Sequence, residues 1–229
     1  LSAAGGDTAK TIANLGGDPE KPFQIFKDVE ELYARRREEL KKWYALRKEE
    51  ESIWRAANKE LAAKLDQFLS GKAPDIDYAK INCGDNVATR AASAAVLSYL
   101  AEHVENMIVA SADLSNSDKT DGFLKKTHAM VKGDFTGRFL QPGVAEFTMA
   151  CIMNGMALHG GVIPACGTFF VFSDYMKPAL RIAALQRLPV KYVWTHDSFR
   201  VGEDGPTHQP IEHEAQLRLM EQLRNHKGE

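Results

Sequence analysis

The chain has 229 residues, of which 44% are hydrophobic and 26% are charged, and its formal net charge is −2. This composition is typical of one soluble globular domain with an appendage, and the length is sufficient to bury a core. The near-neutral charge gives no long-range field for nucleic acid or an acidic membrane, and no apolar run approaches the roughly 18 residues that span a bilayer. We therefore expect neither nucleic acid nor a membrane as a partner.

The N-terminal residues, Leu1 to Gly6, include neither an initiating Met nor a signal-peptide pattern, so we expect a fragment or a chain that follows a leader. Three cysteines, Cys83, Cys151 and Cys166, lie far apart and form no CxxC pair. They predict reduced thiols, small buried side chains and a cytoplasmic protein.

Residues 1–73 are predicted to form a largely helical segment ahead of the main domain. Residues 1–27 are rich in Gly and Pro and indicate a loop, whereas apolar residues from Asp28 to Leu69 recur at helical steps. Asp28 is the expected N-cap, with Glu31 completing a capping box. The mixed-sign charges between the apolar residues indicate a solvated helix face and not a nucleic-acid patch.

Residues 74–229 are predicted to form one α/β domain, because strand-like and helix-like runs alternate after Pro74. Expected helices cover 89–100, 144–158, 174–188 and 212–225, expected strands cover 107–110, 139–140, 162–165 and 190–194, and 115–137 is an expected loop. This alternation predicts a doubly wound, mostly parallel sheet flanked by helices, whose ligands bind at the carboxyl ends of the strands.

The segment Gly202 to Pro210 follows the last expected strand. It has a glycine on either side of two acids, followed by a proline and then a histidine. Such a run can bring a carboxylate and an imidazole to one loop tip with a stiffened backbone. The alternative is a polar turn without chemistry.

Several stretches, in the right order, resemble the middle, pyrimidine-binding domain of transketolases. They are Thr195 to Ser198 with Gly202 to Pro210, Gly143 to Met149 with Ile152 to Gly155, Gly167 to Tyr175, Ala88 to Arg90, and Ser111 to Leu114. The match covers roughly residues 74–218 and implies the thiamine diphosphate-binding fold. It also implies that residues 1–73 are the interdomain linker of that family.

The resemblance implies a transferase of the pentose phosphate pathway that moves a two-carbon ketol unit between sugar phosphates with thiamine diphosphate. Glu146 then matches the catalytic glutamate, which bonds the N1′ nitrogen of the cofactor, and Gly167 would allow close backbone approach. The expected cofactor-binding residues are Asp113, Leu114, Glu146, Phe169, Phe172 and Tyr175. Phe170 alternates with the wall aromatics and is expected in the core.

The same resemblance places five residues at the sugar substrate. Arg90, Ser117 and His196 would surround its terminal phosphate, since guanidinium, hydroxyl and imidazole groups suit a phosphate. Asp204 and His208 would face the donor hydroxyls, with His208 also catalytic through proton transfer.

We expect no metal ligands on this chain, because His103, His128, His159, His213 and His226 are scattered and are interpreted as surface or capping groups. The Gly-Asp-Gly motif that binds magnesium or calcium and the diphosphate is not found here. The resemblance implies that a separate diphosphate-binding domain, from the second subunit of a homodimer, supplies it and is needed for activity.

The chain departs from the family pattern at Ala145, at Phe147 and from Asn116 to Lys119. Two alternatives remain. One is another thiamine diphosphate enzyme, of the dihydroxyacetone synthase or deoxyxylulose phosphate synthase type. The other is a non-catalytic interaction module with the same fold.

Overall fold

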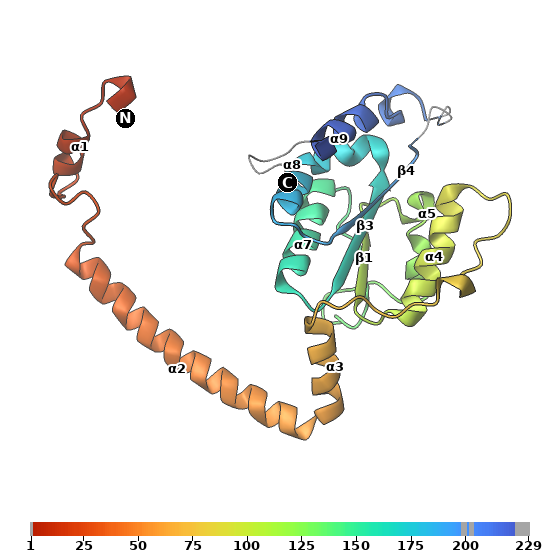
Figure 1. The fold of residues 1–229 in the computed structure, drawn as a ribbon, viewed down its shortest axis with the longest axis horizontal. Coiled ribbons are helices and arrows are strands. Elements are labelled where there is room, and N and C mark those ends of the chain that lie inside the picture. The colour runs from red at the N-terminus through yellow and green to blue at the C-terminus, as the bar shows by residue number, and fades with distance from the viewer. Residues whose placement is uncertain (1, 198–200, 202–203, 223–229) are drawn as a thin grey trace. The chain divides into compact units, whose positions relative to one another are not determined.

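A computed structural model describes residues 2–197, 201 and 204–222 of the chain (Figure 1). The chain divides into two compact units, Leu1–Ala62 and Ala63–Glu229. The boundary between residues 73 and 74 that the sequence suggests stays a prediction. Within the described residues, none of the helices combines the length and the apolar character that crossing a membrane requires.

The first unit is helical, with η1 (Ser2–Ala4), α1 (Thr8–Asn14), α2 (Lys27–Ala57) and the start of α3 (Lys59–Leu69). Asn58 separates α2 from α3 within the segment from Asp28 to Leu69 that the sequence predicted to be helical. Phe26, without a side-chain hydrogen bond, is the N-cap of α2, so the prediction of Asp28 as N-cap is wrong. Asp28 lies in the first turn, where the helix dipole stabilises a negative charge.

The second unit is built on a four-stranded parallel sheet in the order β2-β1-β3-β4. Its strands are β1 (Met107–Ser111), β2 (Phe139–Leu140), β3 (Ile163–Phe169) and β4 (Lys191–Thr195). Val109 lies opposite Phe139 on one side and Ala165 on the other. The central strands are apolar because helices cover both faces of the sheet (Figure 1). This confirms the predicted α/β class.

Successive side chains of the central strands point to opposite faces of the sheet and contribute to two separate hydrophobic cores. On one face α4 (Thr89–His103) and α6 (Asp121–Leu124) pack on the sheet through Leu97, Ala101, Val104, Met107, Val109, Phe123, Phe139 and Ala165. On the other, α7 (Glu146–His159) and α8 (Ser173–Leu185) pack through Ala110, Ala112, Met149, Ala150, Met153, Cys166, Met176 and Ala179.

The remaining elements are short: η2 (Tyr78–Lys80), α5 (Ser115–Asp118), η3 (Phe170–Phe172), η4 (Pro206–His208) and α9 (His213–Gln222). The segment 115–137, predicted to be a loop, contains both α5 and α6. Phe123 of α6 is completely buried, and the guanidinium of Arg138 lies 5.3 Å from its ring centroid. The last three residues of the predicted final helix lie outside the described residues.

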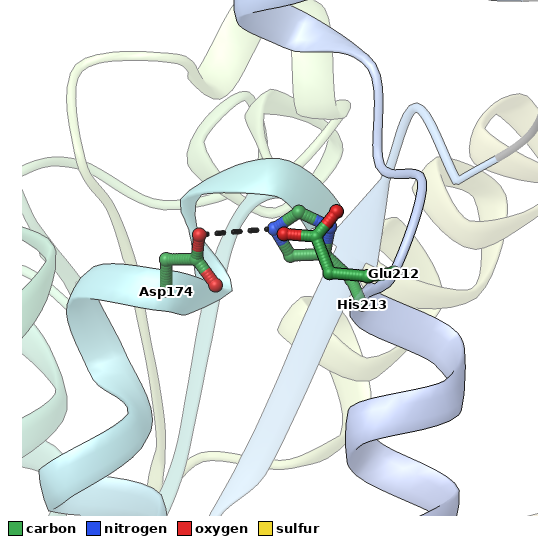
Figure 2. A group of neighbouring side chains, drawn as sticks. All are labelled: Asp174, Glu212 and His213. Atoms are coloured by element: carbon green, nitrogen blue, oxygen red, sulfur yellow. Dashed lines mark ion pairs between the residues drawn. The ribbon is translucent and has the colours of Figure 1, made fainter.

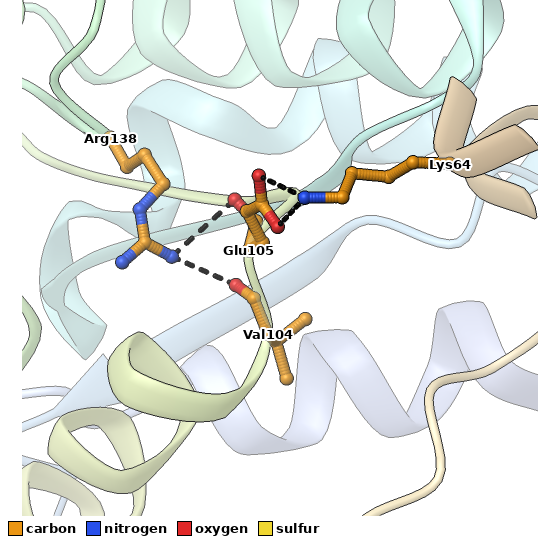
Figure 3. Close-up of polar contacts among 4 residues, drawn as sticks. All are labelled: Lys64, Val104, Glu105 and Arg138. Carbon is orange, nitrogen blue, oxygen red and sulfur yellow. Dashed lines mark hydrogen bonds and ion pairs between the residues drawn. The ribbon is translucent and has the colours of Figure 1, made fainter. Parts of the chain in front are cut away.

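Polar contacts fasten the amino ends of β1 and β2 to the helices (Figure 3). Arg138 donates hydrogen bonds to the carbonyl oxygens of Ala101 and Val104 at the end of α4, at 2.5 and 2.8 Å. Lys64 forms an ion pair of 2.8 Å with Glu105, just before β1. The bonds from Arg138 satisfy open carbonyl oxygens at the end of α4, and together with the Lys64–Glu105 ion pair they hold the amino ends of β1 and β2 in place.

Candidate functional site

The carboxyl ends of the strands carry the sequence-predicted site residues. Asp113 follows β1, Phe172 follows β3, and His196 follows β4. Glu146 begins α7, which follows β2. The chain passes from β1 to β2 on one side of it and then crosses to β3 on the other side, so the strand order reverses at β1. Open parallel sheets bind ligands at such a switch point.

A hollow of about 580 Å³ opens at this edge, and we name it the Glu146 hollow. It is lined by Ala112, Asp113, Leu114, Val144, Ala145, Glu146, Phe147, Thr148, Phe172, Tyr175 and His208. Asp113 has a φ of 65°, which turns the chain sharply after β1. Ala145 and Phe147, two departures from the family pattern, therefore form part of its wall.

Glu146 is the first residue of α7 and only 7% of its surface is exposed. The amino end of a helix favours a carboxylate there. Among the described residues we find no hydrogen bond or ion pair to its carboxylate, which lines the hollow. Buried polar groups normally have partners, so this carboxylate is suited to a ligand that offers one.

Aromatic rings form one wall of the site in a stacked series. The Phe169 and Phe172 centroids are 5.9 Å apart at 9°, and those of Phe172 and Tyr175 are 6.1 Å apart at 28°. Phe169 is not among the residues that line the hollow, and its ring stacks on His196 with the centroids 3.6 Å apart. Phe170 packs on Trp194 in the interior, as predicted. His208 approaches Phe172 edge-on at 5.4 Å.

Arg90, His196 and Ser117 meet although they are far apart in the sequence, and we name them the Arg90 cluster. Arg90 Nη1 donates to the Ser117 carbonyl oxygen at 3.3 Å and lies 3.0 Å from His196 Nε2. Because a guanidinium only donates, His196 Nε2 accepts, and its Nδ1 donates to Thr195 Oγ1 at 2.9 Å. Burial and then the charge of Arg90 lower the pKa of His196.

Asp204 is exposed, and its negative charge works in the opposite direction by raising the pKa of His196. The signature from Gly202 to Pro210 is only partly visible, since residues 202 and 203 lie outside the described residues, as do 198–200. His208 closes η4 and its Nδ1 lies 2.8 Å from Thr207 Oγ1.

A buried network beneath the Arg90 cluster was not foreseen from the sequence. Asp118, 1% exposed, accepts hydrogen bonds from Ser111 Oγ at 2.6 Å and from the amide and hydroxyl of Thr120 at 2.8 and 2.7 Å. Burial raises the pKa of this carboxyl. A Cβ on Gly167 would lie 2.5 Å from Thr120 Cγ2. Gly167 therefore allows the approach of this network, whereas the sequence suggested an approach to the cofactor.

The burial of His213 contradicts another expectation from the sequence. The sequence placed it among surface or capping histidines, but its side chain is 3% exposed and lies near Asp174 and Glu212. The spacing of residues along the chain carried no signal for this burial, because Asp174 is distant in sequence.

The comparisons with known proteins agree with one another. The model of the family "Transketolase, pyrimidine binding domain" matches residues 85–226. A transketolase of Geobacillus stearothermophilus is 49% identical over 167 residues, which are 72% of this chain and 25% of that protein. A probable transketolase of Streptococcus pneumoniae is 41% identical over 95% of this chain and 33% of its own length.

Solved structures give the same result. A transketolase from Leishmania mexicana superimposes with a TM-score of 0.80 at 34% identity, covering 93% of this chain and 32% of that one. A transketolase of Pichia stipitis in complex with sedoheptulose 7-phosphate does so with a TM-score of 0.76 at 36% identity, over the same shares. The chain thus spans about a quarter to a third of the length of these relatives. By sequence and by fold it belongs to the transketolase family, as the pyrimidine-binding domain.

Proposed function

We propose that this chain is the pyrimidine-binding part of an enzyme that transfers a two-carbon ketol unit between sugar phosphates with thiamine diphosphate. The observation that carries the proposal is Glu146, a residue that is 7% exposed and whose carboxylate has no partner among the described residues, at the wall of a hollow beside stacked aromatic rings. Membership of the transketolase family supports it.

The residues around the Glu146 hollow suit an aminopyrimidine. Such a ring needs a flat aromatic surface, an apolar slot and a partner for a ring nitrogen. Phe172 and Tyr175 offer the surface, Leu114 and Val144 are apolar, and the Glu146 carboxylate is the partner. When bound, thiamine diphosphate supplies the carbon nucleophile that makes and breaks bonds beside a carbonyl.

In this proposal the side chains in and around the hollow have different roles. Glu146 holds a proton at the pyrimidine nitrogen N1′, which a carboxylate can share and an amide cannot. Phe169 supports the wall through its contacts with Phe172 and His196. Asp113 and Leu114 close the side after β1, and His208 moves protons at the hydroxyls of the donor sugar, with Asp204.

The Arg90 cluster serves as the anchor for the substrate phosphate. Arg90 engages Ser117 and His196 through the two N–H groups of Nη1, and the three N–H groups on Nε and Nη2 are left for phosphate oxygens. Ser117 bonds Arg90 through its backbone carbonyl oxygen. Its hydroxyl is therefore available for the phosphate only if the Ser117 side chain turns toward the phosphate.

The partners follow from the same proposal. A diphosphate-binding domain, from the second subunit of a homodimer, supplies the ligands of magnesium or calcium.

The relatives above are named transketolases, which favours this function over the dihydroxyacetone synthase and deoxyxylulose phosphate synthase types. The partner-free Glu146 carboxylate argues against a non-catalytic module, which would need no such group. Cys83, Cys151 and Cys166 are free thiols, which supports the expected cytoplasmic location. Cys166 is buried as predicted, whereas Cys83 is half-buried and Cys151 is exposed, so the prediction of three buried side chains is wrong.

The direct test is a transfer assay on the complete enzyme, with a ketose phosphate donor and an aldose phosphate acceptor. We expect transfer that requires both thiamine diphosphate and a divalent cation. Full transfer after removal of thiamine diphosphate would contradict the proposal. Conversion of a ketoacid and an aldose phosphate, without ketol transfer, would favour the deoxyxylulose phosphate synthase type.

A further inference from the structure

A second group of polar side chains gathers where α8 and α9 begin. It consists of Asp174 in the first turn of α8, Glu212 just before α9, and His213, the first residue of α9 (Figure 2). One ligand atom from each residue lies within 4.8 Å of the other two. An imidazole with two carboxylates is a donor set for divalent transition metals such as Zn²⁺.

His213 provides the observation that separates this group from an ordinary acidic cluster. Its side chain is 3% exposed, and among the described residues neither ring nitrogen has a hydrogen bond. Buried polar groups in native proteins nearly always have such a partner. A ring nitrogen faces the Asp174 carboxylate, as Figure 2 shows, and the ring of Phe170 is 5.7 Å away.

The spacing of His213 and Asp174 suits two ligands of one cation. Nε2 lies 3.2 Å from Asp174 Oδ2, which is within ion-pair distance, but the contact does not have the geometry of a hydrogen bond. Ligands of a tetrahedral zinc ion, with bonds of about 2.0–2.1 Å, are about 3.3 Å apart, and each lies to the side of the other's bond. A shared cation accounts for both the distance and the lack of hydrogen-bond geometry.

The surroundings of Asp174 also suit a ligand. Lys177 contacts the other oxygen, Oδ1, and in addition contacts Gln216. Oδ2 is therefore available to a cation while Lys177 orients the carboxylate, as the outer partners of metal ligands do. Glu212 lies 3.9 Å from His213 Nδ1, whereas Asp174 lies at Nε2. Glu212 is 58% exposed, so rotation about its own side-chain bonds is free to carry its carboxylate toward Nε2, to the third position.

We propose that Asp174, Glu212 and His213 bind one divalent transition cation of the zinc type. The site joins the start of α9 to the start of α8. Tyr175 is the next residue after Asp174, and His208 lies five residues before His213. The cation thereby fastens the segment that carries His208 against the aromatic wall. This inference does not depend on the proposed transfer reaction.

The test is a titration of the purified 229-residue chain with ZnCl₂, followed by calorimetry and by thermal unfolding, with MgCl₂ as comparison. We expect one equivalent of Zn²⁺ to bind and to raise the melting temperature, and Mg²⁺ to do neither, because imidazole is a poor ligand for Mg²⁺. Glu212→Gln and Asp174→Asn should each weaken Zn²⁺ binding about tenfold or more. His213→Gln should abolish it.

The matched controls are His103→Gln, a surface histidine stacked on Tyr99, and Glu214→Gln in the first turn of α9. Both should bind Zn²⁺ like the unmodified chain. Equal binding by Glu212→Gln and Asp174→Asn would show an adventitious ion at other histidines and would overturn the proposal. Both residues are substantially exposed, so these two variants decide the question even if His213→Gln fails to fold.

Discussion

The Glu146 hollow and the Arg90 cluster lie at the same edge of the sheet, but they differ in whether their polar groups have hydrogen-bond partners. In the cluster, Arg90, His196 and Ser117 already bond one another. In the hollow, the Glu146 carboxylate has no described partner, and Tyr175 in its wall is 61% exposed. The polar groups of the cluster are thus hydrogen-bonded before a ligand binds, whereas the Glu146 carboxylate gains a partner when a ligand binds.

Because of this difference, we expect the cluster to contribute to substrate affinity and the hollow to contribute to the chemical step. A preformed cluster loses little freedom when a phosphate binds, so it contributes to ground-state binding. A carboxylate without a protein partner is able to share a proton with its ligand, so it contributes to the reacting state. Substitutions in the two places should therefore change different kinetic constants.

The largest expected effect is that of Glu146→Gln in the complete enzyme. The amide keeps the shape but cannot share the proton, so turnover should fall by about 10²- to 10⁴-fold, the usual value of positioned proton transfer. The melting temperature should stay unchanged. Glu60→Gln, at the first turn of α3, is the matched control and should be fully active. Loss of thermal stability with Glu146→Gln would instead assign the residue a structural role.

His208→Ala should have the next largest effect, because it removes a proton-transferring group from the hollow wall. Turnover should fall by about 10²-fold. The fall should be equal for phosphorylated donors and for hydroxypyruvate, since both react at the same atoms. Steady-state kinetics with each donor measures this, and His103→Ala is the control. A rise in KM for phosphorylated donors alone would move His208 to the phosphate.

Arg90→Ala should act on binding. One charge-assisted contact is worth about 1.5–3 kcal/mol, so KM for phosphorylated donors should rise about tenfold to a hundredfold. KM for hydroxypyruvate should change little, because it has no phosphate. Arg181→Ala, on the exposed side of α8, is the control. If Arg90→Ala affects both donors equally, the division between the cluster and the hollow is wrong.

Gly167→Ala tests the buried network beneath the cluster. The added methyl would lie 2.5 Å from Thr120 Cγ2 and 3.1 Å from Asp118 Oδ2. Overpacking of this kind lowers the free energy of unfolding by about 1–3 kcal/mol. Gly155→Ala in α7 meets no atom within 4 Å and should be neutral or stabilising. Urea unfolding of both variants decides the point, and equal midpoints would show that the network tolerates the methyl.

The smallest expected effect is a change in the pKa of His196, which lies below its ordinary value of 6.5 because of burial and the charge of Arg90. The neutral ring therefore contributes stability that is present above pH 6.5 and is lost as the pH falls through the folded-state pKa. In Arg90→Ala this pKa should rise while burial still acts. An NMR titration of the ring measures it, and an unchanged pKa would remove Arg90 as a cause.

The strands and long helices were predictable because their apolar runs match the period and length of buried elements. Met107–Ser111 and Phe139–Leu140 were anticipated almost residue for residue. The short helices α5 and α6 were not, since each has one turn and lies in a polar, Lys-rich segment. In such segments side-chain bonds such as those of Asp118 decide the structure, and no periodicity reveals them.

The site was predictable only through the family resemblance. Arg90 and His196 are 106 residues apart, so no local pattern could have joined them. Phe170 was correctly placed in the core by alternation. Phe169 stacks on Phe172 of the wall, and its role at the cofactor stays a prediction. The burial of His213 was missed for the same reason as the Asp118 network, because both depend on contacts between separate elements.

The most direct test of the account is a structure of the complete enzyme with thiamine diphosphate bound. The account predicts that the aminopyrimidine ring lies in the Glu146 hollow, against Phe172 and Tyr175, with N1′ about 3 Å from a Glu146 carboxylate oxygen. The Arg90 cluster should keep its present contacts. A pyrimidine ring bound elsewhere, or a Glu146 carboxylate turned away from it, would contradict the account.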